Sequence, residues 1–293
     1  MKRRMIPHGF TTLCVSLPTC LVLLAALVRA DEAQPVRLLE QHLDPSFKQC
    51  FVLIEGGQIS CYRRTGDGPT LLLMPGTFSD ARVYVDTIRS LNPEFDLLIL
   101  EYRGLGGSWP PPDASSIEDC ATDAIMVLDA LGVDQCYVGG HSLGGMISLE
   151  LGQRIPERLR GVIPIEGWAY SDVSADAFQR DTKSTLSPQQ LELIQDYRDV
   201  LLKRWTEEQR KMFSSIWKQW NGSEFLRTTE LPVLELWGDR GRERPDRAAL
   251  GLPDRENIEL VWFAGASHSL LIERPREVAE AINDFVARIE QQQ

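Results

Sequence analysis

The first group in this sequence whose setting suggests chemistry is the hydroxyl of Ser142. It is the centre of segment 140–144, GHSLG, which has the pattern G-x-S-x-G, follows a β-run at 136–139 and precedes a helical pattern. A serine at such a strand-to-helix turn has a strained backbone. Glycines are needed at 140 and 144 because any side chain there would collide with the neighbouring strand and helix. The pattern predicts a nucleophile above a sheet, at the positive end of a helix.

A serine hydroxyl is a poor nucleophile until a base removes its proton, so a histidine must lie within hydrogen-bond reach. The sequence contains four histidines. His8 lies in the N-terminal leader, and His42 precedes the first predicted strand. The side chain of His141 is expected to point away from the serine and to pack or bond locally. His268 follows the last predicted strand, where a loop can bring an imidazole over the serine, so we predict that His268 is the base.

With three further motifs, the chain resembles the α/β-hydrolase superfamily over nearly all of residues 48–290. Segment 74–78, MPGTF, resembles the oxyanion turn of the family, and segment 101–108, EYRGLGGS, resembles its Asp-x-Arg-Gly-x-Gly-x-Ser loop. The C-terminal histidine signature is matched by His268 together with Leu270, Glu273, Pro275, Val278, Ile282 and Phe285. The four motifs occur in the family's order, and the resemblance implies its α/β fold.

The resemblance also implies an oxyanion hole, formed by the backbone N–H groups of Thr77 and Leu143. Pro75 stands where the family often has histidine. Because the two donors are backbone groups, this difference is expected to change the packing of the hole and to leave its function intact.

The third member of the triad departs from the family pattern. Segment 231–241 resembles the Gly-Asp-x-Asp turn after the seventh strand, but Gly241 stands where most members carry the acid that orients the histidine. Glu166 ends the sixth predicted strand, where some haloalkane dehalogenases carry their acid, and adjacent strands lie about 4.8 Å apart. We therefore favour Glu166, with Asp239 as the alternative acid and the absence of an effective acid as a third reading. Dehalogenase chemistry itself needs an aspartate nucleophile, whereas position 142 is serine.

The rest of the chain predicts an α/β protein with a mainly parallel sheet covered on both faces, because short runs rich in Val, Ile and Leu alternate with helical patterns. Strands are predicted at 50–55, 58–63, 70–74, 96–101, 135–140, 160–166, 231–237 and 257–263, the first two forming a hairpin. Helices are predicted at 80–91, 116–131, 143–154 and 275–290. Ser115, with Glu118 three residues on, is expected to cap the second helix.

About sixty residues, 168–230, separate the sixth and seventh predicted strands, whereas such a connection usually needs only a few. Ser187 and Thr206 each begin a helical pattern with a glutamine at the third helical position. Tryptophan and phenylalanine recur on these helices, at Trp205, Phe213, Trp217 and Trp220. We predict that 168–230 is a helical cap inserted into a hydrolase core formed by 31–167 and 231–293.

Residues 1–30 have the pattern of a cleaved signal peptide. Three basic residues at 2–4 precede an apolar run that ends in LVLLAAL, and 28–30, VRA, offers small residues at a cleavage site. Pro18 interrupts the run, which argues against the alternative of a permanent membrane anchor. We therefore expect an exported protein, periplasmic or secreted. Loss of the leader removes four basic and no acidic residues and moves the formal charge from −11 to −15, which argues against nucleic acid and anionic membranes as partners.

Four cysteines remain outside the leader. Cys50 and Cys61 lie on the two strands of the predicted hairpin and are close enough to form a disulfide, although four unpaired thiols are an equal alternative. Cys120 and Cys136 are expected to be buried thiols. No Cys/His spacing suggests a metal, and no cofactor is implied.

These features predict a serine hydrolase that forms an acyl-enzyme, most simply a carboxylesterase for small to medium apolar esters, because tryptophans of the cap would cover the strand ends. A C–C bond hydrolase, a perhydrolase or an aminopeptidase would use the same triad. The alternative from another class is a catalytically inactive hydrolase fold that serves as a binding protein, which the missing acid at Gly241 suggests. The sequence leaves the oligomeric state open.

Overall fold

The structure, a computed structural model, describes residues 45–173 and 186–292, apart from the side chains of residues 193, 196 and 197. The predicted signal peptide and His42 lie outside these residues.

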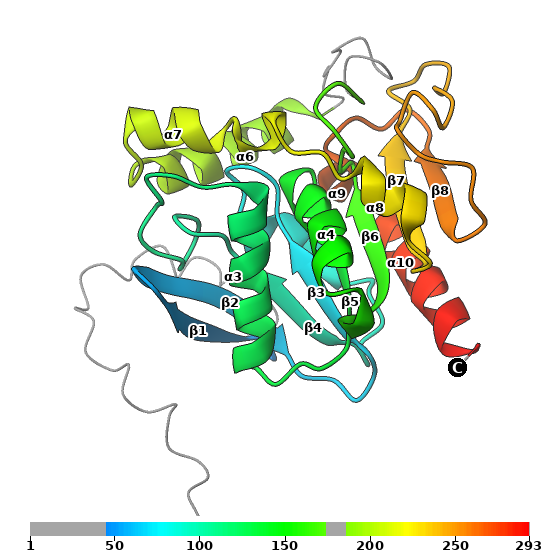
Figure 1. Ribbon diagram of the computed structural model, residues 1–293. Helices are drawn as coiled ribbons and strands as arrows, with labels where there is room; N and C mark the ends of the chain where they lie inside the picture. Colours follow the sequence, from blue (N-terminus) through cyan, green and yellow to red (C-terminus); the bar gives the residue numbers. More distant parts are fainter. Residues whose placement is uncertain (1–44, 174–185, 293) are drawn as a thin grey trace, which may run out of the picture. The chain divides into compact units, whose positions relative to one another are not determined.

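An eight-stranded sheet forms the centre of the described chain, in the order β1-β2-β4-β3-β5-β6-β7-β8 (Figure 1). Its strands are β1 (Lys48–Ile54), β2 (Gly57–Arg64), β3 (Thr70–Met74), β4 (Asp96–Leu100), β5 (Cys136–His141), β6 (Leu159–Ile165), β7 (Val233–Gly238) and β8 (Ile258–Phe263). β1 and β2 form an antiparallel hairpin, β2 runs antiparallel to β4, and the remaining neighbours are parallel. The predicted, mostly parallel sheet is confirmed.

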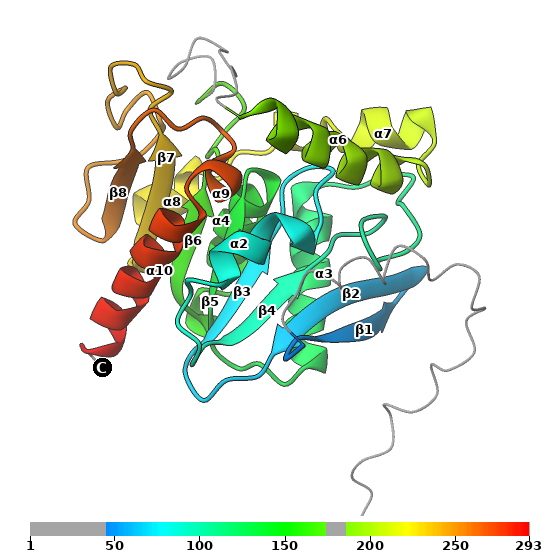
Figure 2. The ribbon, with the colours of Figure 1, turned by 180° about the vertical axis from the view of Figure 1, so that it is seen from behind.

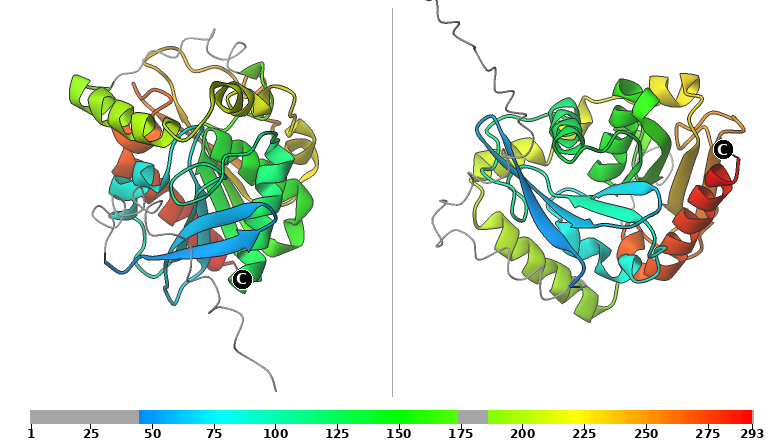
Figure 3. Two further views of the ribbon diagram at one scale, coloured as in Figure 1. Left: turned by 90° about the vertical axis from the view of Figure 1, so that its left-hand side faces the viewer. Right: turned by 90° about the horizontal axis from the view of Figure 1, so that it is seen from below.

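Helices cover both faces of this sheet. The elements are η1 (Ala81–Tyr84), α2 (Val85–Ile88), α3 (Ile117–Ala130), α4 (Leu143–Arg154), η2 (Pro156–Arg158), α6 (Pro188–Leu202), α7 (Glu207–Phe213), η3 (Ile216–Lys218), α8 (Ser223–Thr228), α9 (Leu270–Glu273) and α10 (Pro275–Glu290). α3, α4 and α8 lie in front of the strands in Figure 1, and α2, α9 and α10 lie behind them, as Figure 2 shows. The view from below in Figure 3 shows the same layers, with α3 and α4 on one side of the strands and α10 on the other. Each face therefore buries its own apolar core.

Two of the three predicted N-capping residues are correct. Ser187 and Thr206 each accept a hydrogen bond from the N–H of a glutamine, whose side chain bonds back to the capping residue. The predicted cap at Ser115 is wrong by one residue. Ser116 has the extended backbone that capping requires and accepts from the N–H of Asp119, while the Ser115 hydroxyl lies 3.7 Å from the sulfur of Cys120.

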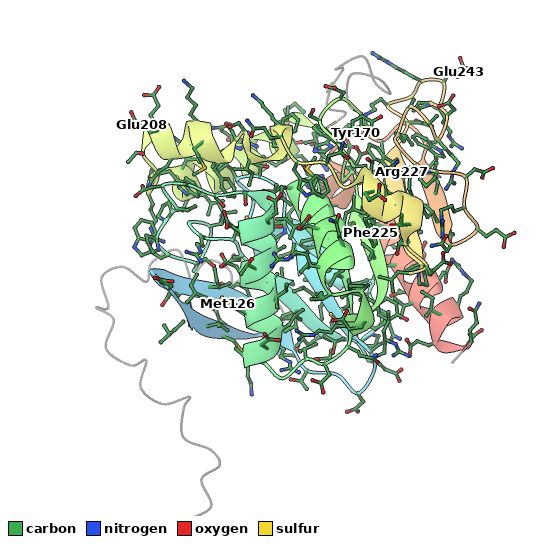
Figure 4. All side chains as sticks on the ribbon, in the orientation of Figure 1. Met126, Tyr170, Glu208, Phe225, Arg227 and Glu243 are labelled. Carbon is green, nitrogen blue, oxygen red and sulfur yellow. The ribbon has the colours of Figure 1, made fainter. Side chains whose placement is uncertain are left out.

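The described helices of the inserted segment lie in two places. α6 and α7 lie over the carboxyl ends of the strands (Figure 1), whereas α8 packs on the core helix α4. Phe225 of α8, labelled in Figure 4, fills the space beside Gly152, where an added Cβ would lie 2.4 Å from its ring. The indole N–H of Trp220 donates to Glu150 of α4 over 2.9 Å. These contacts fix the end of the insertion to the core.

Cys50 and Cys61 are directly opposite each other in the β1–β2 pair, and both are free thiols in this structure. Cys120 and Cys136 are buried free thiols, as predicted. Among the described residues there is no cluster of three or more His, Cys, Asp or Glu side chains that could hold a metal ion. Nor does 45–173 or 186–292 contain a helix long and apolar enough to cross a membrane.

Candidate active site

Ser142 lies at the turn between β5 and α4, with φ 55° and ψ −113°. A non-glycine residue in this region stores roughly 1–3 kcal/mol of strain. Two glycines allow the turn, as predicted: a Cβ on Gly140 would lie 2.5 Å from the backbone of Gly144, and one on Gly144 would lie 2.1 Å from the carbonyl oxygen of Met74. The Ser142 N–H donates to the carbonyl of Ile165 over 2.8 Å and holds the turn against β6. The fold thus places the Ser142 hydroxyl at the carboxyl edge of the sheet.

His268 and Glu166 are in direct contact. Nδ1 of His268 lies 3.1 Å from Oε2 of Glu166, within the distance expected if Glu166 orients the imidazole. Glu166 is fully buried directly after β6, with φ 54°. Burial disfavours its ionised form, but hydrogen bonds from His268 and Arg240, with the charge of Arg240, outweigh this and lower the pKa of the carboxyl below its ordinary value. Since an ionised carboxylate only accepts, Nδ1 of His268 carries a proton and Nε2 is free to act as a base.

Arg240 is a member of the site that our sequence analysis missed. Its guanidinium donates to both oxygens of Glu166, over 2.7 Å from Nη1 and 2.6 Å from Nη2, and its side chain is buried. Gly238 adds a backbone N–H at 2.7 Å. The sequence shows a basic residue directly before Gly241, where the family's usual acid is missing, but it does not show which group that residue binds.

Asp239, the alternative acid, bonds elsewhere. Its carboxylate accepts the N–H of Gly265 at 2.7 Å and that of Gly241 at 2.9 Å, and Arg244 approaches it to 3.3 Å. Burial raises the pKa of Asp239, but these donors outweigh it and the net shift is downward. Asp239 thus ties the loop after β7 to the loop after β8, and none of these three bonds involves His268.

Ser142, His268 and Thr77 line one cavity of about 360 Å³. Its walls come from the turn after β3, from η1 and α2, from α6, and from α9 with the residue before it. Leu143 is the first residue of α4, and the first N–H groups of a helix have no partner within it. Gly76 lies against the serine, since a Cβ there would be 3.3 Å from Cβ of Ser142. The two backbone segments expected to form the oxyanion hole therefore flank Ser142.

We had expected the side chain of His141 to pack or bond locally, but it forms a long-range hydrogen bond and packs against His268. Its Nε2 lies 2.6 Å from the backbone carbonyl oxygen of His268, and the two imidazole rings are 4.9 Å apart. Burial, together with the neighbouring His268, lowers the pKa of His141 to about 4. A neutral ring beside a carbonyl oxygen must donate from Nε2, so His141 links the nucleophile turn to the loop of the predicted base.

Comparison with known proteins gives a consistent picture of the fold. Residues 69–185 match the family model of the alpha/beta hydrolase fold. In a search of curated proteins, the chain is similar to one named "Putative carbamate hydrolase RutD" from Azorhizobium caulinodans, with 34% identity over 118 residues, 40% of this chain and 44% of that protein. The match thus spans less than half of that relative's length.

Solved structures are similar over most of the described chain. A membrane phospholipase A, titled a novel bacterial virulence factor, has a TM-score of 0.70 and 20% identity, covering 88% of this chain and 91% of that one. The carboxylesterase CesB (YbfK) from Bacillus subtilis has a TM-score of 0.66 and 19% identity, covering 87% and 96%. The sheet, the turn at Ser142 and these matches show that the chain has the α/β-hydrolase fold.

Proposed function

We propose that this protein is an exported serine hydrolase that cleaves carboxylic esters through an acyl-enzyme on Ser142. The observation that carries the proposal is the hydrogen bond of 3.1 Å between His268 and the buried Glu166, made at the wall of a cavity that Ser142 also lines. A strained serine, a histidine and a buried carboxylate at one site are the arrangement that acyl transfer requires.

In the proposed reaction, Nε2 of His268 removes the proton from the Ser142 hydroxyl as its oxygen attacks the ester carbonyl. The N–H groups of Thr77 and Leu143 bind the oxyanion of the tetrahedral intermediate. His268 then passes the proton to the leaving alcohol, and the acyl group remains on Ser142. A water molecule, deprotonated by the same imidazole, attacks the acyl-enzyme and releases the acid.

Glu166 acts by orienting His268 and by stabilising its protonated form. Its ionised carboxylate holds the imidazole in the tautomer with the proton on Nδ1, and it stabilises the imidazolium that forms during each proton transfer. A buried carboxylate at the end of β6 can thus do what the family's acid after β7 does, with Gly241 in that acid's place.

The cavity supports a small to medium, largely apolar substrate. Its apolar lining comes from the turn after β3, from η1 and α2, from α6, and from α9: Phe78, Val83, Val85, Ile194, Leu201, Leu271 and Ile272. The similar proteins described above are named as a putative carbamate hydrolase, a phospholipase and a carboxylesterase. Carbamates and esters share the carbonyl that a serine attacks, so these names are compatible with the proposed chemistry.

Labelling with a fluorophosphonate probe tests the proposal, because the probe reacts only with an activated serine. We expect label on Ser142, located by peptide mass spectrometry, and none on Ser142→Ala. Ser79 lines the same cavity, so Ser79→Ala is the matched control and should be labelled like the wild type. A folded wild-type protein that takes no label would instead support the binding-protein alternative.

Export rests on the leader pattern of residues 1–30 and has a separate test. The intact mass of the protein recovered outside the cytoplasm should correspond to a chain that begins near Asp31. A mass that corresponds to a start at Met1 would contradict cleavage.

A further inference from the structure

Glu166 has all of its acceptor positions occupied. Oε1 accepts from Gly238 and from Nη1 of Arg240, both at 2.7 Å, and Oε2 accepts from Nη2 of Arg240 at 2.6 Å and from Nδ1 of His268 at 3.1 Å. A carboxylate offers about four lone-pair positions. The base therefore shares one oxygen with a guanidinium, and its own bond is the longest of the four.

Arg240 is fixed by burial of its side chain and by a backbone hydrogen bond. Its side chain is 7% exposed, its backbone has φ 55°, and its N–H donates to the carbonyl of Ala266 over 2.9 Å. Ala266 lies two residues before His268, so the guanidinium and the imidazole are carried by segments that are bonded together. A fork that is fixed in this way also fixes the plane and rotation of the carboxylate.

We propose that Arg240 is a positioning residue that sets the base strength of His268 by sharing and partly neutralising the Glu166 carboxylate. This inference rests on the proposed function of the site. An unpaired carboxylate would stabilise the imidazolium by its full negative charge. A carboxylate paired with arginine stabilises it less, because the positive guanidinium lies beside it. Arg240 thereby weakens the stabilisation that Glu166 gives to the imidazolium of His268.

Several other charged or titratable groups lie near this pair. Four of them line the same cavity as His268, namely Asp80, Arg82, Asp86 and Arg198, and Arg82 pairs with Asp80. Glu273 accepts hydrogen bonds from Ser267, the neighbour of His268.

His141 faces His268 from β5, and burial with the neighbouring His268 lowers its pKa to about 4, so it is neutral at neutral pH. Glu235 of β7 is buried near enough to Glu166 to feel its charge. Burial raises the pKa of Glu235 to about 8. Arg240 is the cation in direct contact with Glu166, and its hydrogen bonds and charge help to lower the pKa of that carboxyl.

The test is a titration of the His268 imidazole by NMR in the full chain, with labelled histidine and His268→Gln to assign the signal. Arg240→Met should raise the pKa of His268 by about one pH unit or more, since removal of a neighbouring cation favours the imidazolium. The acidic limb of the kcat/KM profile should move to higher pH by the same amount. Arg240→Gln should shift the pKa in the same direction and serves if the methionine variant does not fold.

Arg244 provides the matched control, because it pairs with Asp239 on the same loop at 3.3 Å. Arg244→Met should leave the His268 titration unchanged.

An unchanged pKa in a folded Arg240 variant, or an equal shift in Arg244→Met, would overturn the inference. The titration needs no turnover, so its result is separate from the labelling of Ser142. A protein that takes no label but shows the shift would lose the proposed function and keep the coupling between Arg240 and His268.

Discussion

His141 donates from Nε2 to the backbone carbonyl oxygen of His268 over 2.6 Å, across 127 positions of the sequence. The donor directly precedes the proposed nucleophile, and the acceptor belongs to the proposed base. One hydrogen bond thus joins the turn after β5 to the loop after β8. We infer that it fixes the distance over which the proton must pass.

His141→Ala should therefore lower kcat about tenfold to a hundredfold while KM changes little, because a small displacement of catalytic groups is costly. The free energy of unfolding should fall by about 1 kcal/mol for the lost hydrogen bond. Steady-state kinetics on an activated ester, with urea unfolding, measure both. His141→Gln, which retains an N–H donor, should recover part of the loss. Full kcat in a folded alanine variant would show that the link is dispensable.

Substitution of the two candidate acids should separate their roles. Glu166→Gln keeps the shape of the side chain but removes the charge that stabilises the imidazolium, so kcat should fall on the order of a thousandfold or more with little change in KM. Asp239→Ala leaves the N–H groups of Gly241 and Gly265 without their acceptor, so it should lower the free energy of unfolding by about 1–3 kcal/mol. The catalytic loss should be much smaller for Asp239→Ala. The opposite ranking in kinetic assays would assign the acid to Asp239.

Features that depend on local sequence could be predicted, and features that depend on distant loops could not. The glycines around Ser142 and the alternation of apolar strand runs with helical patterns could be recognised, because each depends on residues within a short stretch of sequence. The contact of Glu166 with His268 could be anticipated because both follow strands of one parallel sheet. Arg240 could not be placed, since its fork meets Glu166 across 74 positions and a long side chain at a turn has many directions open to it. The hydrogen-bond partner of His141 could not be predicted either, because the carbonyl of His268 lies 127 positions away in the sequence.

The attachment of the cap gives a further prediction. The indole N–H of Trp205 donates to the carbonyl of Gly104 over 2.8 Å, and its ring meets Phe78, next to Thr77, edge-on with centroids 5.4 Å apart. Trp205→Ala should lower the free energy of unfolding by about 3 kcal/mol or more. It should also raise KM more than it lowers kcat, because Trp205 anchors the segment that follows α6, and α6 forms one wall of the cavity. Trp205→Phe keeps most of the packing and should lose only about 1 kcal/mol. Equal losses in the two variants would refute the role assigned to the indole ring.

The last prediction concerns Glu235, a fully buried carboxyl within β7. Its Oε2 accepts from the indole of Trp237 at 2.9 Å, and its Oε1 has no hydrogen-bond partner among the described residues. Burial raises its pKa from 4.5 to about 8 against the opposing effects of Trp237 and Arg247. Between these values the unfolded chain has released the proton and the folded chain retains it, so the free energy of unfolding falls as the pH rises.

Glu235→Gln removes this titration while keeping an oxygen that can accept from Trp237. Below the window from 4.5 to about 8, the two proteins should differ by no more than about 1 kcal/mol. Above it, the variant should be more stable than the wild type by a few kcal/mol. Urea unfolding at pH values on both sides of the window measures the difference, in which other groups that titrate alike in both proteins cancel. A difference that stays constant with pH would mean that Glu235 is already ionised in the folded protein at neutral pH.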